Sequence, residues 1–361
     1  MKKIHWKINK RFVANLITYA LVTAAYIICQ TMMNEGMMSR SLKGQMIPIC
    51  VYIVMAVSLN LTVGISGELS LGHAGFMSVG AFSGIIMSSW LLSAFDMQNT
   101  VLRLILALAT GGVFAGIAGV LIGIPVLRLQ GDYLAIVTLA FGEIIRNVLN
   151  CLYVSVEGRA LHISFNNPQV AGKMILNGPA GATGVGKIAL FSVGFALVIF
   201  TLFVVLNLIN SRSGRAIMAI RDSRIAAESV GINVTKYRMM AFVVSAVLAG
   251  MAGALYGLNY STVTASKFKF DTSILVLVFV VLGGIGNIRG SIIAATLLTV
   301  LPELLRSFSD YRMLVYAIVL ILVMLLTNNP TLKAFFRALR EKLTPRRKKA
   351  AVSAQKGGDA K

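Results

Sequence analysis

The feature that most constrains this chain is a series of apolar runs, each long enough to form a membrane-spanning helix. An α-helix needs about 20 residues to cross the hydrocarbon core of a bilayer. The chain is 57% hydrophobic and only 13% charged, which is too apolar for a soluble protein of 361 residues. The sequence therefore predicts an all-α polytopic membrane protein.

We expect ten crossings, separated by short polar segments. They lie near residues 12–30, 46–65, 73–93, 101–127, 133–152, 188–209, 239–258, 273–284, 290–306 and 313–327. The eighth is short and ends in a glycine-rich stretch, so a half-helix and a short complete span both stay open. A glycine- and serine-rich break before the third crossing is a second candidate for a re-entrant segment.

The charge distribution indicates how the chain is oriented in the membrane. Its net charge is +21, and most of its Lys and Arg residues lie in residues 1–11, 211–238 and 331–361. Basic segments next to spans stay in the cytoplasm and contact anionic lipid, so nucleic acid is not an expected partner. An even number of crossings puts both termini and the 211–238 loop inside, and the polar segment 153–187 outside as a surface loop. Residues 12–330 then form the transmembrane domain.

Small residues recur four positions apart in two of the predicted spans. Such spacing forms a flat strip that lets neighbouring helices approach closely in lipid. The strips are Gly111, Gly112, Ala115, Gly116 and Gly119, and Ala249, Gly250, Gly253 and Gly257. This pattern predicts packing and identifies no substrate.

Four blocks of the chain resemble a known family. They comprise residues 58–81, 126–150, 214–257 and, more weakly, 280–306. Together they are similar to the inner-membrane permeases of bacterial ABC importers for branched-chain amino acids, and specifically to the second, M-type permease of the pair. One departure is an insertion near residues 151–176, where the family moves directly to a short glycine-rich stretch.

The resemblance implies a bacterial inner-membrane complex with a division of labour. A second homologous permease completes the pathway for leucine, isoleucine or valine, two cytoplasmic ABC ATPases drive transport, and an extracytoplasmic binding protein delivers the solute. The 211–238 loop is then the ATPase dock, with a coupling helix near residues 215–231; an ordinary interfacial helix is the alternative. The expected coupling residues are Arg215, Arg221, Asp222, Ala226, Ala227, Glu228 and Gly231. The charged ones orient the helix, the alanines enter a groove, and the glycine ends it.

Ionisable side chains near or inside the spans are candidates for the solute pathway or a gate. A charge in mid-bilayer costs roughly 2.5 to 3.5 kcal/mol on insertion scales, so each needs a partner or water. Glu143 and Arg146 have the i,i+3 spacing of an ion pair, which is as good an explanation as a pathway role. The pathway candidates are Glu68, His73, Tyr133, Thr138 and Glu143.

Other functional classes fit the sequence less well. Gly181, Gly186 and Lys187 match a phosphate-binding loop, but Ile188 stands where Mg²⁺ needs Ser or Thr, so ATP and Mg²⁺ are expected in partner subunits. No metal-ligand or nucleophile motif favours an enzyme. An ABC permease for urea, short amides or another small polar solute stays open, as does a proton-coupled secondary transporter, although no inverted repeat supports the latter.

Overall fold

The structure is a computed structural model that describes residues 10–129, 131–165 and 172–305, together with scattered positions between 311 and 325. The chain divides into two compact units, Met1–Glu303 and Leu304–Lys361. The predicted basic segments 1–11 and 331–361 and the tenth crossing lie wholly or largely outside the described residues.

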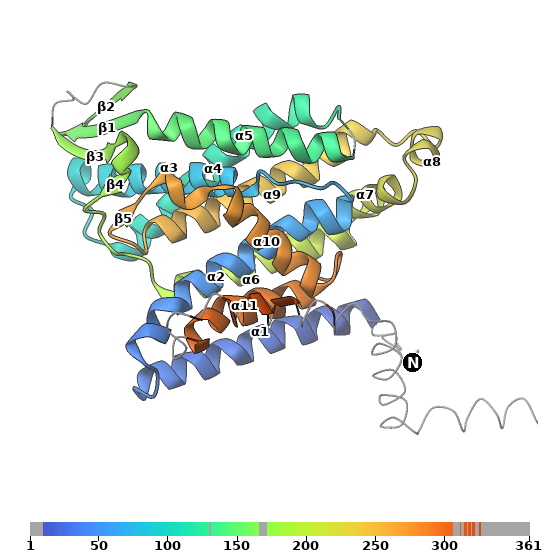
Figure 1. Ribbon diagram of the computed structural model, residues 1–361, viewed down its shortest axis with the longest axis horizontal. Helices are drawn as coiled ribbons and strands as arrows, with labels where there is room; N and C mark the ends of the chain where they lie inside the picture. Colours follow the sequence, from blue (N-terminus) through green and yellow to red (C-terminus); the bar gives the residue numbers. More distant parts are fainter. Residues whose placement is uncertain are drawn as a thin grey trace, which may run out of the picture. The chain divides into compact units, whose positions relative to one another are not determined.

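Helices dominate the described part of the chain (Figure 1). Nine of them correspond to the first nine predicted crossings: α1 (Lys10–Asn34), α2 (Arg40–Asn60), α3 (His73–Phe95), α4 (Thr100–Val126), α5 (Asp132–Asn150), α6 (Phe191–Asn210), α9 (Val234–Gly257), α10 (Phe270–Gly283) and α11 (Ile288–Leu304). Within the described residues, six helical segments are long and apolar enough to cross a membrane. The prediction of a multi-pass helical protein is confirmed at this level.

Helices α3, α4 and α9 pack against one another at the centre of the first unit. The small-residue strips lie at these contacts, as predicted. A Cβ added at Gly250 would stand 2.3 Å from the Cβ of Ala115, and one at Gly253 would stand 1.9 Å from the backbone oxygen of Met77. Only glycine permits this approach, because any side chain there would overlap the neighbouring helix.

Two breaks interrupt the helices. After α2, the chain continues as π-helix η1 (Leu61–Ser66), turns at residues 67–72 and starts α3 at His73. Helix α10 has 14 residues, which at about 1.5 Å per residue is about 21 Å and shorter than a hydrocarbon core of about 30 Å. The two breaks meet, because the N–H of Gly286 donates to Oδ1 of Asn60 at 2.8 Å.

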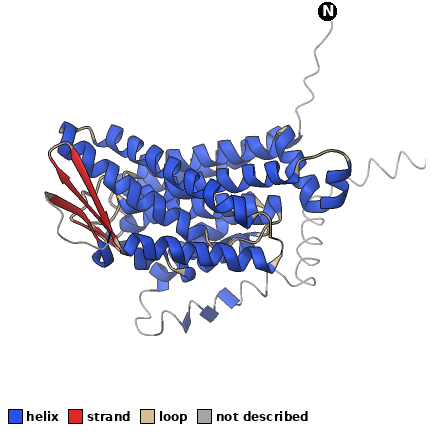
Figure 2. Ribbon diagram, turned by 90° about the horizontal axis from the view of Figure 1, so that it is seen from above, coloured by secondary structure: helices blue, strands red, loops and turns tan. Residues whose placement is uncertain are grey.

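A five-stranded antiparallel sheet covers one end of the helices (Figure 2). Its strands are β1 (Leu152–Glu157), β2 (Ala160–Phe165), β3 (Lys173–Asn177), β4 (Ala182–Thr183) and β5 (Thr262–Val263), in the order β2-β1-β3-β4-β5. Ala182 of β4 pairs with Val263 of β5, so the segments that follow α5 and α9 lie on the same side. The remaining helices α7 (Arg212–Asp222) and α8 (Arg224–Ser229) lie at the opposite end (Figure 1).

Two expectations need correction. The chain is not all-α, since the predicted surface loop 153–187 contains four of the five strands. Apolar and polar residues alternate on both sides of a turn at Gly158, which is the pattern of a β-hairpin. The segment was predicted as a loop because it is polar overall. The segment predicted to form one coupling helix contains two helices, because Ser223 adopts an extended conformation with φ −157° between α7 and α8.

Candidate functional site

Helix α7 is held on the membrane helices by its apolar face. Ser211 caps its start, with Oγ accepting a hydrogen bond from the N–H of Gly214 at 3.1 Å. Three positions on, Ile217 packs in a buried cluster with Leu61 and Ile65 of η1 and with Ala241 of α9. The helix therefore rests directly on the π-helical break.

Helix α8 has defined caps at both ends, despite its length of six residues. Ser223 Oγ accepts from the N–H of Ala226 at 3.3 Å. At the other end, the N–H of Gly231 donates to Glu228 and the N–H of Ile232 donates to Ala227, each at 3.0 Å. This is a Schellman motif, and it requires the left-handed backbone that Gly231 supplies with φ +80°. The predicted glycine cap is present.

The inner face of α8 is apolar and buried. Ala227 is 3% exposed and packs with Ile220 of α7 and Val234 of α9. The expectation that Ala227 enters a partner's groove is therefore wrong, because its side chain already lies in the protein's own core. Ala226, by contrast, lies on the exposed face.

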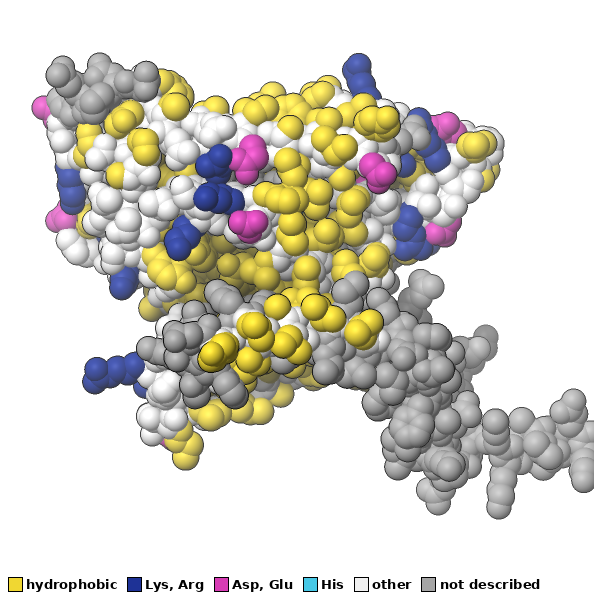
Figure 3. All heavy atoms as spheres, viewed as in Figure 1, with side chains coloured by type: hydrophobic (Ala, Val, Ile, Leu, Met, Phe, Trp, Pro, Cys, Tyr) yellow, Lys and Arg dark blue, Asp and Glu magenta, His cyan; other side chains and the backbone are white. Residues whose placement is uncertain are grey.

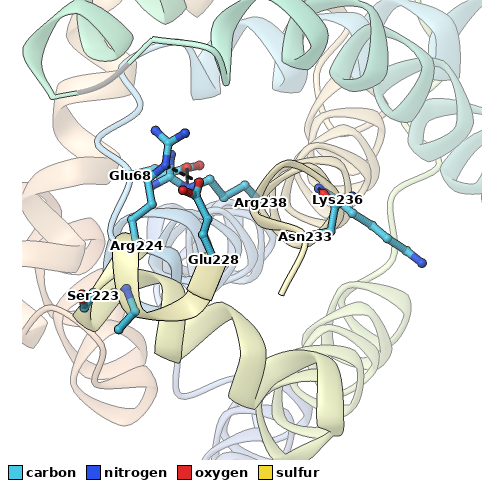
Figure 4. Close-up of polar contacts among 8 residues, drawn as sticks. Glu68, Ser223, Arg224, Glu228, Asn233, Lys236 and Arg238 are labelled. Carbon is cyan, nitrogen blue, oxygen red and sulfur yellow. Dashed lines mark hydrogen bonds and ion pairs between the residues drawn. The ribbon is translucent and has the colours of Figure 1, made fainter. Parts of the chain in front are cut away.

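The outer face of α8 and its C-terminal turn carry two large apolar side chains that the sequence analysis did not single out. Ile225 is 81% exposed and Val230 is 73% exposed. On the same helix, Arg224 and Glu228 form an i,i+4 ion pair at 2.9 Å (Figure 4). The sequence shows that Ile225 and Val230 are apolar residues in a polar, basic segment. It does not show which side of the helix faces outward.

Arg221 connects α7 to the helical break. Its Nη1 donates to the backbone oxygen of Gly64 in η1 at 3.0 Å, and its Nη2 and Nε donate to Asp222 Oδ1 at 2.9 and 3.1 Å. The orienting role expected of Arg221 and Asp222 agrees with this geometry. Arg215 makes a local contact, with Nη1 donating to the backbone oxygen of Asn210 at 3.3 Å.

A second connection joins the start of α9 to the turn before α3. Arg238 Nε lies 2.9 Å from Glu68 Oε1, and both side chains are largely buried (Figure 4). The contact is an ion pair without the alignment of a hydrogen bond, so among the described residues the Glu68 oxygens have no hydrogen-bond donor. Burial raises the pKa of Glu68 to about 7, against the lowering effect of Arg238.

The other predicted pathway residues differ in burial and in their contacts. His73 is buried, with Nε2 2.9 Å from Ser58 Oγ. Thr138 is buried and its Oγ1 accepts from the N–H of Leu71 at 3.0 Å, whereas Tyr133 is exposed. Glu143 forms the ion pair with Arg146 at 2.7 Å. Their pathway roles stay predictions.

Buried polar residues around the two breaks were missed by the sequence analysis. Asn60 donates through Nδ2 to Ser291 Oγ at 2.9 Å, and Ser273 Oγ accepts from the N–H of Ala74 at 3.0 Å. Single Asn and Ser residues are common within apolar runs. Their role in linking segments distant in the sequence is visible only where α2, η1, α10 and α11 contact one another. No group of His, Cys, Asp or Glu within the described ranges could hold a metal ion.

The space-filling view completes the description of the protein class. Apolar side chains cover much of the middle of this face, and Lys and Arg side chains lie at both ends, including the end that carries α7 and α8 (Figure 3). The fold and this polar end define a multi-pass helical membrane protein with a structured polar platform at one face.

Comparison with known proteins identifies the family. Residues 43–324 match the family model described as the branched-chain amino acid transport system permease component, and the chain belongs to this family. It is 34% identical over 309 residues to the permease protein LivM of Salmonella typhimurium and to LivM of Escherichia coli, covering 76% of this chain and 66% of each relative. Identity to the permease protein LivH of Salmonella typhimurium is 26% over 290 residues, or 76% of this chain and 88% of LivH. No solved structure matches.

The comparison confirms the resemblance seen in the sequence blocks. Identity is higher to LivM than to LivH, in agreement with an M-type permease. The chain spans 66% of the length of these LivM relatives, just under two thirds.

Proposed function

We propose that this chain is a permease subunit of a bacterial ABC importer for branched-chain amino acids. The names of the relatives, which are high-affinity branched-chain amino acid transport permeases, support this solute class. The importer contains a second homologous permease, two cytoplasmic ATPases and an extracytoplasmic binding protein. The chain itself binds no nucleotide or metal.

The main support for the proposal is that α7 and α8 have a buried inner face and an exposed apolar outer side. Their inner faces are fixed to η1 and α9 by Ile217, Ile220 and Ala227, and their outer side presents Ile225 and Val230. Two large, exposed apolar side chains on an amphipathic helix can insert into a hydrophobic groove on a soluble partner. The partner in an importer is the ATPase.

The proposed topology follows the charge distribution. Ten crossings within residues 12–330 put the 211–238 loop and both termini in the cytoplasm of a cell whose inner membrane holds the complex. The sheet, at the opposite end from α7 and α8, then faces the binding protein (Figure 1).

The test is uptake in right-side-out membrane vesicles that contain the complete complex and enclose ATP. We expect ATP-dependent uptake of radiolabelled leucine, isoleucine and valine that requires the binding protein and competes poorly with urea or acetamide. Uptake that persists without ATPase subunits under a proton gradient would contradict the proposal and favour a secondary transporter.

A further inference from the structure

An apolar cavity of about 560 Å³ lies between α3, α4 and the edge of the sheet. This volume is within the range of about 300–1,000 Å³ typical of small-molecule sites. The residues around it come from α3, α4, the end of α5, β1 and β2. They are Val79, Phe82, Ser83, Ile86, Met87, Trp90, Thr110, Phe114, Leu149, Leu152, Leu161, Ile163 and Phe165. Only Ser83 and Thr110 contribute hydroxyl groups, so the cavity suits a hydrocarbon and not an amino acid.

The wall on β2 belongs to the insertion at residues 151–176. Leu161, Ile163 and Phe165 alternate along this edge strand and line the cavity, and Ile163 and Phe165 are 58% and 63% exposed. A soluble edge strand would present charges at such positions. Apolar residues there indicate that this face of the strand meets a hydrocarbon.

The depth of the cavity matches one leaflet of a bilayer. Its lining on α3 runs from Val79 to Trp90, which are eleven positions and about 16 Å apart along the helix. Half of a hydrocarbon core of about 30 Å is about 15 Å. Trp90 lies at the end of α3 nearer the sheet, where an interfacial tryptophan is expected.

A cation lies at the interfacial end of the cavity. The indole N–H of Trp90 donates to the backbone oxygen of Arg159 at 3.0 Å, in the turn between β1 and β2. The Arg159 side chain is exposed, and its guanidinium lies 5.9 Å from the centre of the Phe95 ring. The apolar cavity is as deep as one leaflet and has an arginine at the headgroup level. It therefore matches a phospholipid, which has an apolar chain and an anionic phosphate.

We propose that this cavity binds one acyl chain of a glycerophospholipid from the leaflet on the sheet side, with the lipid phosphate at Arg159. The hairpin formed by β1 and β2 thus binds lipid and anchors the sheet to the membrane surface. The proposal goes beyond transport, and it holds whatever solute the permease carries.

Tryptophan quenching tests the proposal directly. The chain has two tryptophans, Trp6 and Trp90, so the full-length Trp6→Phe protein reports on the cavity alone. The protein is reconstituted with phosphatidylglycerol brominated on its acyl chains, and quenching is measured against the mole fraction of brominated lipid. We expect half-maximal quenching at a mole fraction several-fold below that for random lipid contacts.

Two variants on the same background separate the cavity from the lipid-facing surface. Ser83→Phe fills the cavity and is expected to abolish the selective quenching. Val113→Phe adds the same ring at a position that is 59% exposed on α4 and outside the cavity, so it should leave quenching unchanged. Equal quenching curves for the parent protein and Ser83→Phe would overturn the proposal.

The headgroup contact and the folding of the variants are tested separately. Arg159→Gln should raise the half-maximal mole fraction several-fold, and equal quenching of the parent by brominated diacylglycerol, which lacks phosphate, would overturn the role of Arg159. Native mass spectrometry needs no variant to fold: the parent protein should retain a phospholipid after delipidation, and a parent that retains none contradicts the proposal. Neither readout depends on transport.

Discussion

Arg221 of α7 donates a hydrogen bond to the backbone oxygen of Gly64, 3.0 Å away in π-helix η1. This contact links the polar platform to the point where the second membrane helix loses its regular geometry. π-Helical segments are frequent at functional sites. A displacement of α7 by a bound partner would therefore reach the break between α2 and α3 through a single side chain and the packing of Ile217 beneath it.

Loss of this link should uncouple ATP hydrolysis from transport. We expect Arg221→Leu to assemble with the ATPases and to retain ATP hydrolysis, while leucine uptake falls by about tenfold, in the range of coupling energies of about 1–3 kcal/mol. Both rates are measured in proteoliposomes. Arg215→Leu is the control, since the hydrogen bond of Arg215 is a local one, to the backbone oxygen of Asn210. An equal loss of uptake in both variants would show that the Gly64 contact is not specific.

The two adjacent alanines of α8 should respond differently to a charge. Ala227→Asp buries an unpaired carboxylate in the cluster with Ile220 and Val234, and we expect it to destabilise the protein by about 3 kcal/mol or more. Ala226→Asp, on the exposed face, should leave the thermal unfolding temperature nearly unchanged. Thermal unfolding in detergent distinguishes them, and similar melting temperatures would contradict the placement of α8.

A substitution that normally strengthens a helix should weaken this one. Alanine is favoured over glycine in helices by about 1 kcal/mol, but the Cβ of Gly250→Ala would collide with Ala115 and with the backbone of Gly111. We expect a melting temperature several degrees lower. Gly44→Ala in α2 has no atom within 4 Å of the added Cβ and should be neutral or stabilising.

The pair of Glu68 and Arg238 should make stability depend on pH. Burial raises the pKa of Glu68 to about 7, above the value of about 4.3 of an exposed glutamate, so the folded protein holds this proton more tightly than the unfolded chain. Stability from this residue is therefore full below about pH 4 and declines as the pH rises through 7.

Removing the cation should steepen this decline. Arg238→Leu leaves the Glu68 carboxylate without its counter-charge, so the variant should lose more stability between pH 6 and pH 8 than the parent. The double variant Glu68→Gln, Arg238→Leu should lose this added pH dependence. Parallel pH profiles for the parent and Arg238→Leu would contradict the ion pair.

Most of the fold could be predicted from the sequence because lipid imposes strong local rules. Span length placed nine helices near their observed positions, and glycine spacing identified packing faces on α4 and α9, although not which helices they contact. The sheet could not be predicted in the same way, because its closing strand β5 comes from a distant loop and β4 has only two residues.

The sequence predicted which segment forms the candidate site, but not which of its side chains are exposed. Polarity and capping residues located α7, α8 and Gly231, but which alanine faces inward depends on the break at Ser223. If α7 and α8 formed one continuous helix, Ala226 and Ala227 would point in other directions relative to α7. The polar contacts of Asn60 arise from segments more than 200 residues apart, and no local pattern reports them.

The most direct test of the central claim is co-purification of the ATPases with Ile225→Asp, using full-length protein from native membranes. Ile225 is 81% exposed, so the substitution should leave folding intact, as verified by thermal unfolding. Met37→Asp is the matched control, because Met37 is an apolar residue 71% exposed in the turn between α1 and α2. The account predicts that Ile225→Asp loses the bound ATPases while Met37→Asp retains them. Full retention of the ATPases by a folded Ile225→Asp protein would contradict it.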